Sequence, residues 1–157
     1  MIFFSVFIYA QNISLNSFGS VGQSNIPTAR FFSEGTMSFA LKEEQTFRRL
    51  NVLAQPYDWL EVSIFYADIP ALRYKAAEEV GISRPKQDKG FNFKIKLKDE
   101  SAYSPAIALG LSDFAGSGIF AGEYIVLSKK IGKLDFHGGL GWGIYSSGIQ
   151  IDNPLIH

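Results

Sequence analysis

Apolar and polar residues alternate along much of the second half of the chain, most regularly over residues 91–98. Because successive side chains of a β-strand point to opposite faces of a sheet, this alternation predicts a strand with one apolar and one polar face. The apolar set is Phe91, Phe93, Ile95 and Leu97, and the polar set is Asn92, Lys94, Lys96 and Lys98. A sheet of such strands separates an apolar environment from a polar one.

Other segments alternate in the same way and are bounded by turn residues. Pro56, Tyr57 and Asp58 mark a tight turn, so the strands on either side are expected to form a hairpin. We therefore predict an all-β fold, an antiparallel up-and-down meander. The predicted strands cover about residues 36–42, 50–55, 60–67, 90–99, 105–113, 118–128 and 133–143.

The remaining residues divide the chain further. Residues 2–10 are apolar but too few to span a bilayer as a helix, so we predict a signal peptide over residues 1–10, with a first buried strand as the alternative. Residues 11–35 are rich in Ser, Asn and Gly and are predicted to be irregular. Residues 36–157 form the predicted sheet, interrupted by a long loop at about residues 68–88, where residues 71–80 favour a short helix.

Composition excludes several classes of function. Fifteen Lys and Arg balance fifteen Asp and Glu over 157 residues, so the net charge of zero offers no electrostatic case for binding nucleic acid. The chain has no cysteine, which excludes disulfides and thiolate metal sites. With 14 Phe, 7 Tyr and 15 Gly, the composition favours strands joined by tight turns.

No group of residues predicts catalysis. His137 has no second histidine at the spacing of a metal site, and the neighbouring acids Asp99 and Glu100 cannot face a sugar from two sides as a glycosidase pair must. We therefore predict no enzymatic activity, no cofactor and no metal site.

Several short blocks, in order, resemble the YjbH-like family of exopolysaccharide-associated outer-membrane proteins, over roughly residues 17–145. Near the start they are Phe18-Gly19-Ser20-Val21-Gly22, Pro27-Thr28-Ala29-Arg30 and Glu34-Gly35-Thr36. Later blocks are Asp88-Lys89-Gly90-Phe91, residues 105–111, residues 116–120, Glu123-Tyr124 and Gly139-Leu140-Gly141-Trp142-Gly143.

This resemblance implies a partial or small outer-membrane β-barrel of a Gram-negative bacterium that supports exopolysaccharide biosynthesis or export without catalysis. Members of the family are usually several times longer, and many carry a lipidated cysteine. Residues 151–157 also lack the amphipathic closing strand of such barrels, so we expect a piece of a longer barrel. The alternative is a soluble periplasmic β-sandwich adaptor that binds polysaccharide or a partner in the export machinery.

Two sets of residues are candidates for contact with the surroundings. Lys94, Lys96 and Lys98 form a cationic row that could face an acidic polysaccharide, although lysines also protect exposed strand edges. Aromatic residues near strand ends suit a membrane interface, and we assign Trp59, Tyr124 and Trp142 to it. The expected partners are outer-membrane lipid, a polysaccharide and other export proteins.

Overall fold

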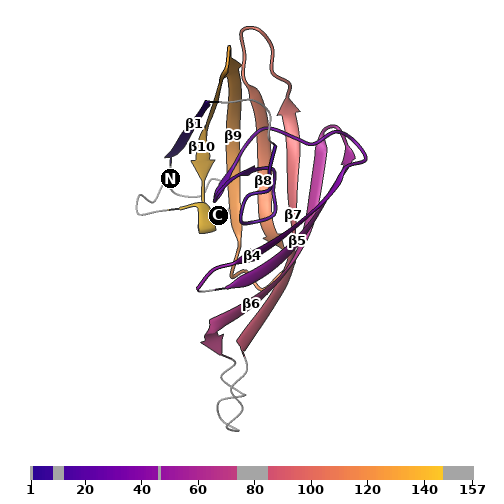
Figure 1. The fold of residues 1–157 in the computed structure, drawn as a ribbon, viewed down its shortest axis with the longest axis vertical. Helices are drawn as coiled ribbons and strands as arrows, with labels where there is room; N and C mark the ends of the chain where they lie inside the picture. The colour runs from indigo at the N-terminus through magenta and orange to yellow at the C-terminus, as the bar shows by residue number, and fades with distance from the viewer. Residues whose placement is uncertain (1, 9–12, 46, 74–84, 147–157) are drawn as a thin grey trace, which may run out of the picture.

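The computed structural model describes residues 2–8, 13–45, 47–73 and 85–146. Most of these residues form one antiparallel sheet of eight strands, in the order β1-β10-β9-β8-β7-β6-β5-β4 (Figure 1). The strands are β1 (Ile2–Ile8), β4 (Met37–Glu43), β5 (Arg48–Tyr57), β6 (Leu60–Arg73), β7 (Pro85–Lys98), β8 (Ala106–Phe114), β9 (Gly122–Ile131) and β10 (Leu134–Gly141).

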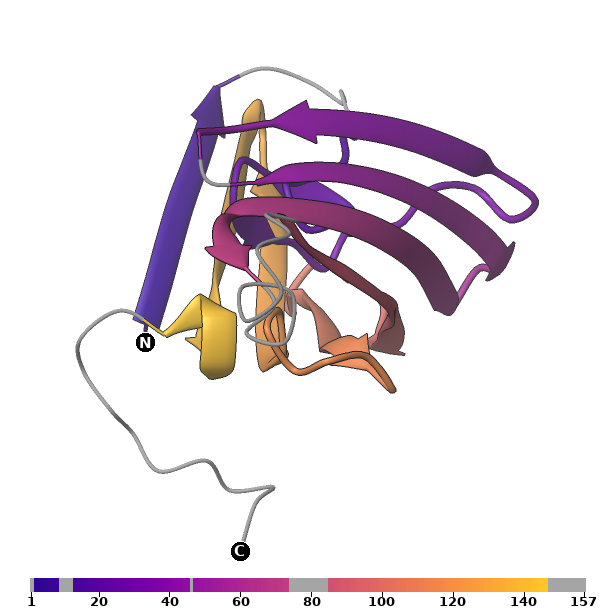
Figure 2. The same ribbon diagram turned by 90° about the horizontal axis from the view of Figure 1, so that it is seen from below.

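From β4 to β10 every strand pairs with its neighbour in sequence, which confirms the predicted all-β meander. The sheet curves strongly into a partial barrel (Figure 2). Residues 2–8, predicted to belong to a signal peptide, form edge strand β1 and pair with β10. The described strands include no ladder between β1 and β4, so the partial barrel has two open edges.

Two prolines lie where the strand ladder slips. The β5–β6 hairpin turns at Asp58 and Trp59, and Pro56 lies within the register shift that precedes this turn. Pro70 lies within a second shift between Ile69 and Arg73. Proline has no backbone N–H to donate to the ladder, and a bulge tolerates this absence, so β6 continues past Pro70.

As a result, the connection between β6 and β7 is shorter than the predicted loop at about residues 68–88. Residues 71–73 end β6 instead of starting a helix, and the rest of the predicted helical stretch lies outside the described residues.

The outer, convex face of the sheet is apolar and exposed. Phe39 and Leu41 on β4 are 69% and 78% exposed, and Ile64 on β6 is 51% exposed. Strand alternation places these side chains away from the concave side. Phe39, Leu41 and Ile64 occupy the apolar positions of the alternating sequence pattern in their strands.

The inner, concave face is polar and is covered by the chain itself. Residues 14–31, here called the inner segment, lie against it and contain the short hairpin of β2 (Gly22–Gln23) and β3 (Ile26–Pro27). Small apolar clusters around Ala108 and Phe65 complete the packing between the sheet, the inner segment and the 3-10 turn η1 (Gly143–Tyr145). The described residues contain no helix long and apolar enough to cross a membrane.

Candidate functional site

A buried ion pair lies at the centre of the inner face. Glu61 on β6 and Lys94 on β7 are directly opposite each other in the antiparallel register. Lys94 Nζ is 2.8 Å from Glu61 Oε2, and both side chains are almost completely excluded from solvent. Two opposite charges this deeply buried require each other and further hydrogen bonds to offset the loss of hydration.

Those further hydrogen bonds come from the inner segment. Glu61 accepts the Ser20 hydroxyl at 2.5 Å and the Val21 N–H at 3.2 Å. Lys94 donates to the carbonyl oxygens of Val21 at 3.2 Å and Arg30 at 2.9 Å. The Glu61 carboxylate therefore accepts from donors of the inner segment, and the Lys94 ammonium donates to acceptors of the same segment.

Arg49 on β5 provides a second anchor. Its guanidinium lies 3.7 Å from the centre of the Phe65 ring and 4.8 Å from that of Phe120, in cation–π geometry. It also donates to the Phe18 carbonyl oxygen at 3.1 Å, and the Asn92 amide donates to the same oxygen at 2.8 Å. Two strands thus hold one carbonyl group of the inner segment.

Strand β9 supplies a third anchor. The Ala29 N–H donates to Ser128 Oγ at 2.8 Å, and this hydroxyl is also 2.8 Å from His137 Nδ1. The Tyr124 hydroxyl lies 3.2 Å from Ser20 Oγ. The inner segment is therefore bonded to β5, β6, β7 and β9 through its main chain and Ser20, and to β4 through Lys42, which donates to Ser17 Oγ.

Glycines allow the close approach of these layers. Gly19 has φ +82°, and a Cβ there would lie 2.5 Å from Asn51 Oδ1. On the inner face of β8, a Cβ at Gly110 would lie 2.1 Å from the Tyr124 ring. Any larger residue at Gly110 would displace the ring that contacts Ser20.

An ionic cluster lies where the inner segment reaches the rim of the sheet. Arg30 forms a two-point contact with Asp135, at 3.0 and 2.6 Å, and is 2.6 Å from Glu100. Burial opposes the charge of Arg30, but its hydrogen bonds to Asp135 and Glu100 outweigh this effect and raise its pKa. Burial likewise acts to raise the pKa of Glu100, but hydrogen bonds from Arg30, the Lys130 N–H and Lys129 hold it below its usual value.

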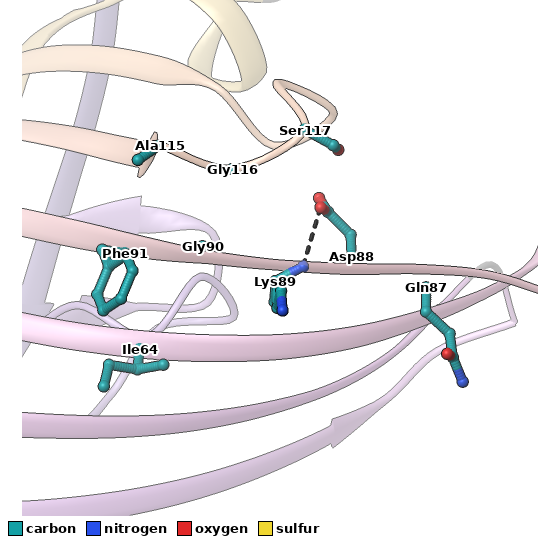
Figure 3. A pocket seen from close by; sticks show the side chains of 9 residues that line it. All are labelled: Ile64, Gln87, Asp88, Lys89, Gly90, Phe91, Ala115, Gly116 and Ser117. Carbon is teal, nitrogen blue, oxygen red and sulfur yellow. Dashed lines mark hydrogen bonds between the residues drawn. The ribbon is translucent and has the colours of Figure 1, made fainter.

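A shallow pocket of about 430 Å³ lies at one end of β7, beside the loop that follows β8 (Figure 3). Asp88 extends from β7 toward Ser117 on that loop, while Phe91 and Ile64 lie on the opposite side of the strand. The Asp88 carboxylate accepts the N–H of Lys89 at 2.9 Å. This pocket is separate from the contacts of the inner segment.

Comparison with known proteins identifies the family of this chain. The model of a family described as exopolysaccharide biosynthesis protein YbjH matches residues 14–157. The chain belongs to the YjbH family. It is 36% identical over 142 residues to a protein of Escherichia coli (strain K12) named uncharacterized lipoprotein YjbH, covering 90% of this chain and 20% of that relative. No solved structure matches the chain.

The family match confirms the predicted resemblance, and the structure shows where the predicted lysines of this YjbH-family chain lie. Lys94 does not face an open lumen, because the inner segment and Glu61 enclose its ammonium group. Lys96 is partly buried, 3.1 Å from Asp99, and Lys98 is exposed at the end of β7. The three lysines therefore do not act as one row, although polysaccharide contact by Lys96 and Lys98 stays a prediction.

The predicted interface aromatics also separate. Tyr124 was assigned to the membrane interface, and this is wrong: it lies on the inner face at 2% exposure, because Gly110 leaves room for its ring. Trp59 is half exposed at the β5–β6 turn and stacks on Tyr57 with ring centres 5.6 Å apart. Trp142 is partly buried just after β10. The interface role of the two tryptophans stays a prediction.

Sequence reasoning missed Glu61, Arg49 and Arg30. Glu61 and Arg49 occupy polar positions of alternating strands, which was the available signal, but such positions are ordinarily solvated. Arg30 lies in a segment without periodicity. Their partners are far away in sequence, so only the register of the sheet and the path of the inner segment bring them together.

Proposed function

We propose that this YjbH-family chain is a non-catalytic part of the wall of an outer-membrane β-barrel that supports exopolysaccharide biosynthesis or export in a Gram-negative bacterium. The observation that carries the proposal is the inversion of the sheet. Its apolar face is exposed, and its charged face is buried.

A soluble sheet normally packs its apolar face on a core and leaves its polar face in water. Here Phe39 and Leu41 are largely exposed while Arg49 and Lys94 are at most 1% exposed. A contiguous exposed apolar surface of this kind marks contact with a membrane or another protein, and the alternation of apolar-out with polar-in is typical of membrane barrels.

The limits of the apolar surface fit a lipid layer. At one end, Glu43, Arg48 and Asp68 are paired in one row across β4, β5 and β6, and Arg48 is 2.7 Å from Glu43. At the other end, Tyr57 and Trp59 stack at the β5–β6 turn. Charges beyond the apolar surface and aromatic rings at its edge are expected where a barrel meets the headgroup region.

The relative supports an envelope location. The Escherichia coli protein is named a lipoprotein, which is consistent with membrane association, and this chain spans about a fifth of its length. In this proposal residues 1–10 direct export, although the structure pairs residues 2–8 with β10. Sequencing the N-terminus of the purified protein distinguishes a removed signal from a retained strand.

Cell fractionation tests the membrane proposal. We expect the protein to sediment with outer membranes, to remain there after a high-salt wash, and to require detergent for release. Recovery in the soluble periplasmic fraction without detergent would favour the adaptor instead. The non-catalytic proposal is tested separately, by incubating purified protein with the exopolysaccharide of its host and measuring chain length, which should not change.

A further inference from the structure

We propose that the inner segment, residues 14–31, is a plug that closes the polar interior of the barrel wall, and that the Glu61–Lys94 pair is the latch that holds it. The inference rests on the proposed membrane function, because a plug matters only if the sheet separates two compartments. Its seating can nevertheless be tested without a membrane.

The inner segment contacts the wall through polar groups as well as through apolar side chains, of which Phe18, Ala29 and Phe31 belong to or pack on the small clusters. Many of the polar contacts are made by the main chain of the segment. The carbonyl oxygens of Phe18, Val21 and Arg30 accept hydrogen bonds from side chains of the sheet. The N–H groups of Val21 and Ala29 donate hydrogen bonds to side chains of the sheet.

The curvature of the sheet also requires something inside it. In a closed eight-stranded barrel the side chains fill the interior or leave room for one small ligand. Here eight strands curve around an additional stretch of main chain, and β1 and β4 are not paired with each other among the described residues. A wall of this curvature without the inner segment would enclose a polar, hydrated space.

The latch is suited to release. Glu61 and Lys94 are 2.8 Å apart and both belong to the wall, on β6 and β7, and not to the inner segment. Withdrawal of the segment therefore leaves no isolated buried charge, which would be strongly destabilising. The pair can hold the segment through Ser20, Val21 and Arg30 and still support the wall without it.

Exchanging the two charges separates the role of the pair in holding the inner segment from its role in supporting the wall. In the double variant Glu61→Lys/Lys94→Glu, the wall keeps an ion pair, but an ammonium faces the Ser20 and Val21 donors and a carboxylate faces the Val21 and Arg30 carbonyls. The Ser20 hydroxyl can turn to accept, but the Val21 N–H then faces a donor and the two carbonyl oxygens face a carboxylate, which disfavours seating. An ion pair with a purely structural role would tolerate the exchange.

A disulfide provides the matched control. Because the chain has no cysteine, Ala29→Cys/Ser128→Cys introduces only two thiols, at neighbouring positions where the main-chain N–H of residue 29 is 2.8 Å from the side-chain oxygen of residue 128. Arg30 provides the reporter, since it is the first Lys or Arg of the sequence and trypsin can cleave after it only when the segment leaves the wall. Combining the charge exchange with the disulfide should restore protection under oxidising conditions and lose it on reduction.

The experiment uses liposomes of Escherichia coli phospholipid loaded with a small fluorescent dye. We expect the unaltered protein to retain the dye, and the charge-exchanged protein to release it about tenfold faster or more, because buried donors and acceptors are mismatched. The variant that combines the charge exchange with the disulfide should retain the dye when oxidised and release it when reduced. Cleavage after Arg30 should follow the same order.

Several results would overturn the inference. Leakage through the unaltered protein would show that the inner segment closes nothing, and protection of Arg30 in the charge-exchanged protein would show that the pair is not the latch. Cleavage after Arg30 without leakage would show a movable segment that is not a plug. Failure to associate with liposomes would instead count against the membrane function, while trypsin cleavage in detergent would still report on seating.

Discussion

The inner and outer faces of the same strands follow opposite rules of burial. On β7 the charged Lys94 is 1% exposed, while its neighbour Ile95 is 38% exposed. Lys94 has three oxygen partners, and two of them are carbonyl oxygens of the inner segment that crosses above it, whereas Ile95 faces outward. The comparison teaches that a side chain of this sheet is buried where the inner segment covers it, whatever its polarity. The uncovered apolar surface is left for lipid, in the proposed function.

The two faces should therefore respond differently to substitution. Glu61, Lys94 and Ser128 on the inner face have particular partners, so a change at one of them leaves a buried donor, acceptor or charge without one. The outer face has no such pairing to lose, and its apolar residues should be interchangeable with one another but not with charges. The following variants test this difference.

The largest effect is expected for Lys94→Met. The change leaves the Glu61 carboxylate buried without its cation, and we expect the free energy of unfolding to fall by about 3–5 kcal/mol. Urea unfolding in detergent micelles, followed by tryptophan fluorescence, measures it. The double variant Glu61→Gln/Lys94→Met removes the orphaned charge while the Gln carbonyl can still accept from Ser20, so it should recover much of the loss. A double variant no more stable than Lys94→Met would contradict the proposed pairing.

A charge on the outer face should come next. Ile64 lies on β6 within the apolar surface, so Ile64→Arg should cost about 2–4 kcal/mol in a lipid bilayer, as cationic substitutions near the midplane of barrels do. The matched control is Ile131→Arg, since Ile131 is an isoleucine of similar exposure that ends β9 beside the turn to β10. Folding into liposomes is compared for the two variants. Equal, negligible costs would indicate that the outer face meets water.

A smaller effect is expected from Gly110→Ala on the inner face. The new methyl group would overlap the Tyr124 ring, so we expect a loss of about 1–3 kcal/mol from overpacking. Pairing the change with Tyr124→Ala should remove most of its additional cost, because the overlapping ring is gone. Urea unfolding of the four forms gives the coupling energy, and a coupling near zero would mean that the two residues do not share this space.

The alternation of residues 91–98 was enough to predict the strand and to separate Phe91 from Lys94, because side-chain direction in a strand depends only on parity. The destination of residues 14–31 could not be predicted in the same way. That segment has no periodicity, and its position is set by hydrogen bonds to residues up to 105 positions away, such as Arg30 to Asp135. Covering the polar face reversed the expected exposure of Lys94, and packing against Gly110 did the same for Tyr124.

The smallest effect is expected at the rim, where both faces end. The pKa of Glu100 is held below its usual value of 4.5, so its ionised form stabilises the folded state above that pH, and the contribution is lost as the pH falls through the lowered pKa. Because Glu100 is partly exposed, Glu100→Gln should cost less than about 1 kcal/mol at neutral pH. Unfolding curves of the two proteins should therefore differ slightly at neutral pH and converge as the pH falls below the lowered pKa of Glu100. A difference that persists in acid would mean that Glu100 acts through packing or neutral hydrogen bonds, and that the rim cluster with Arg30 contributes little through charge.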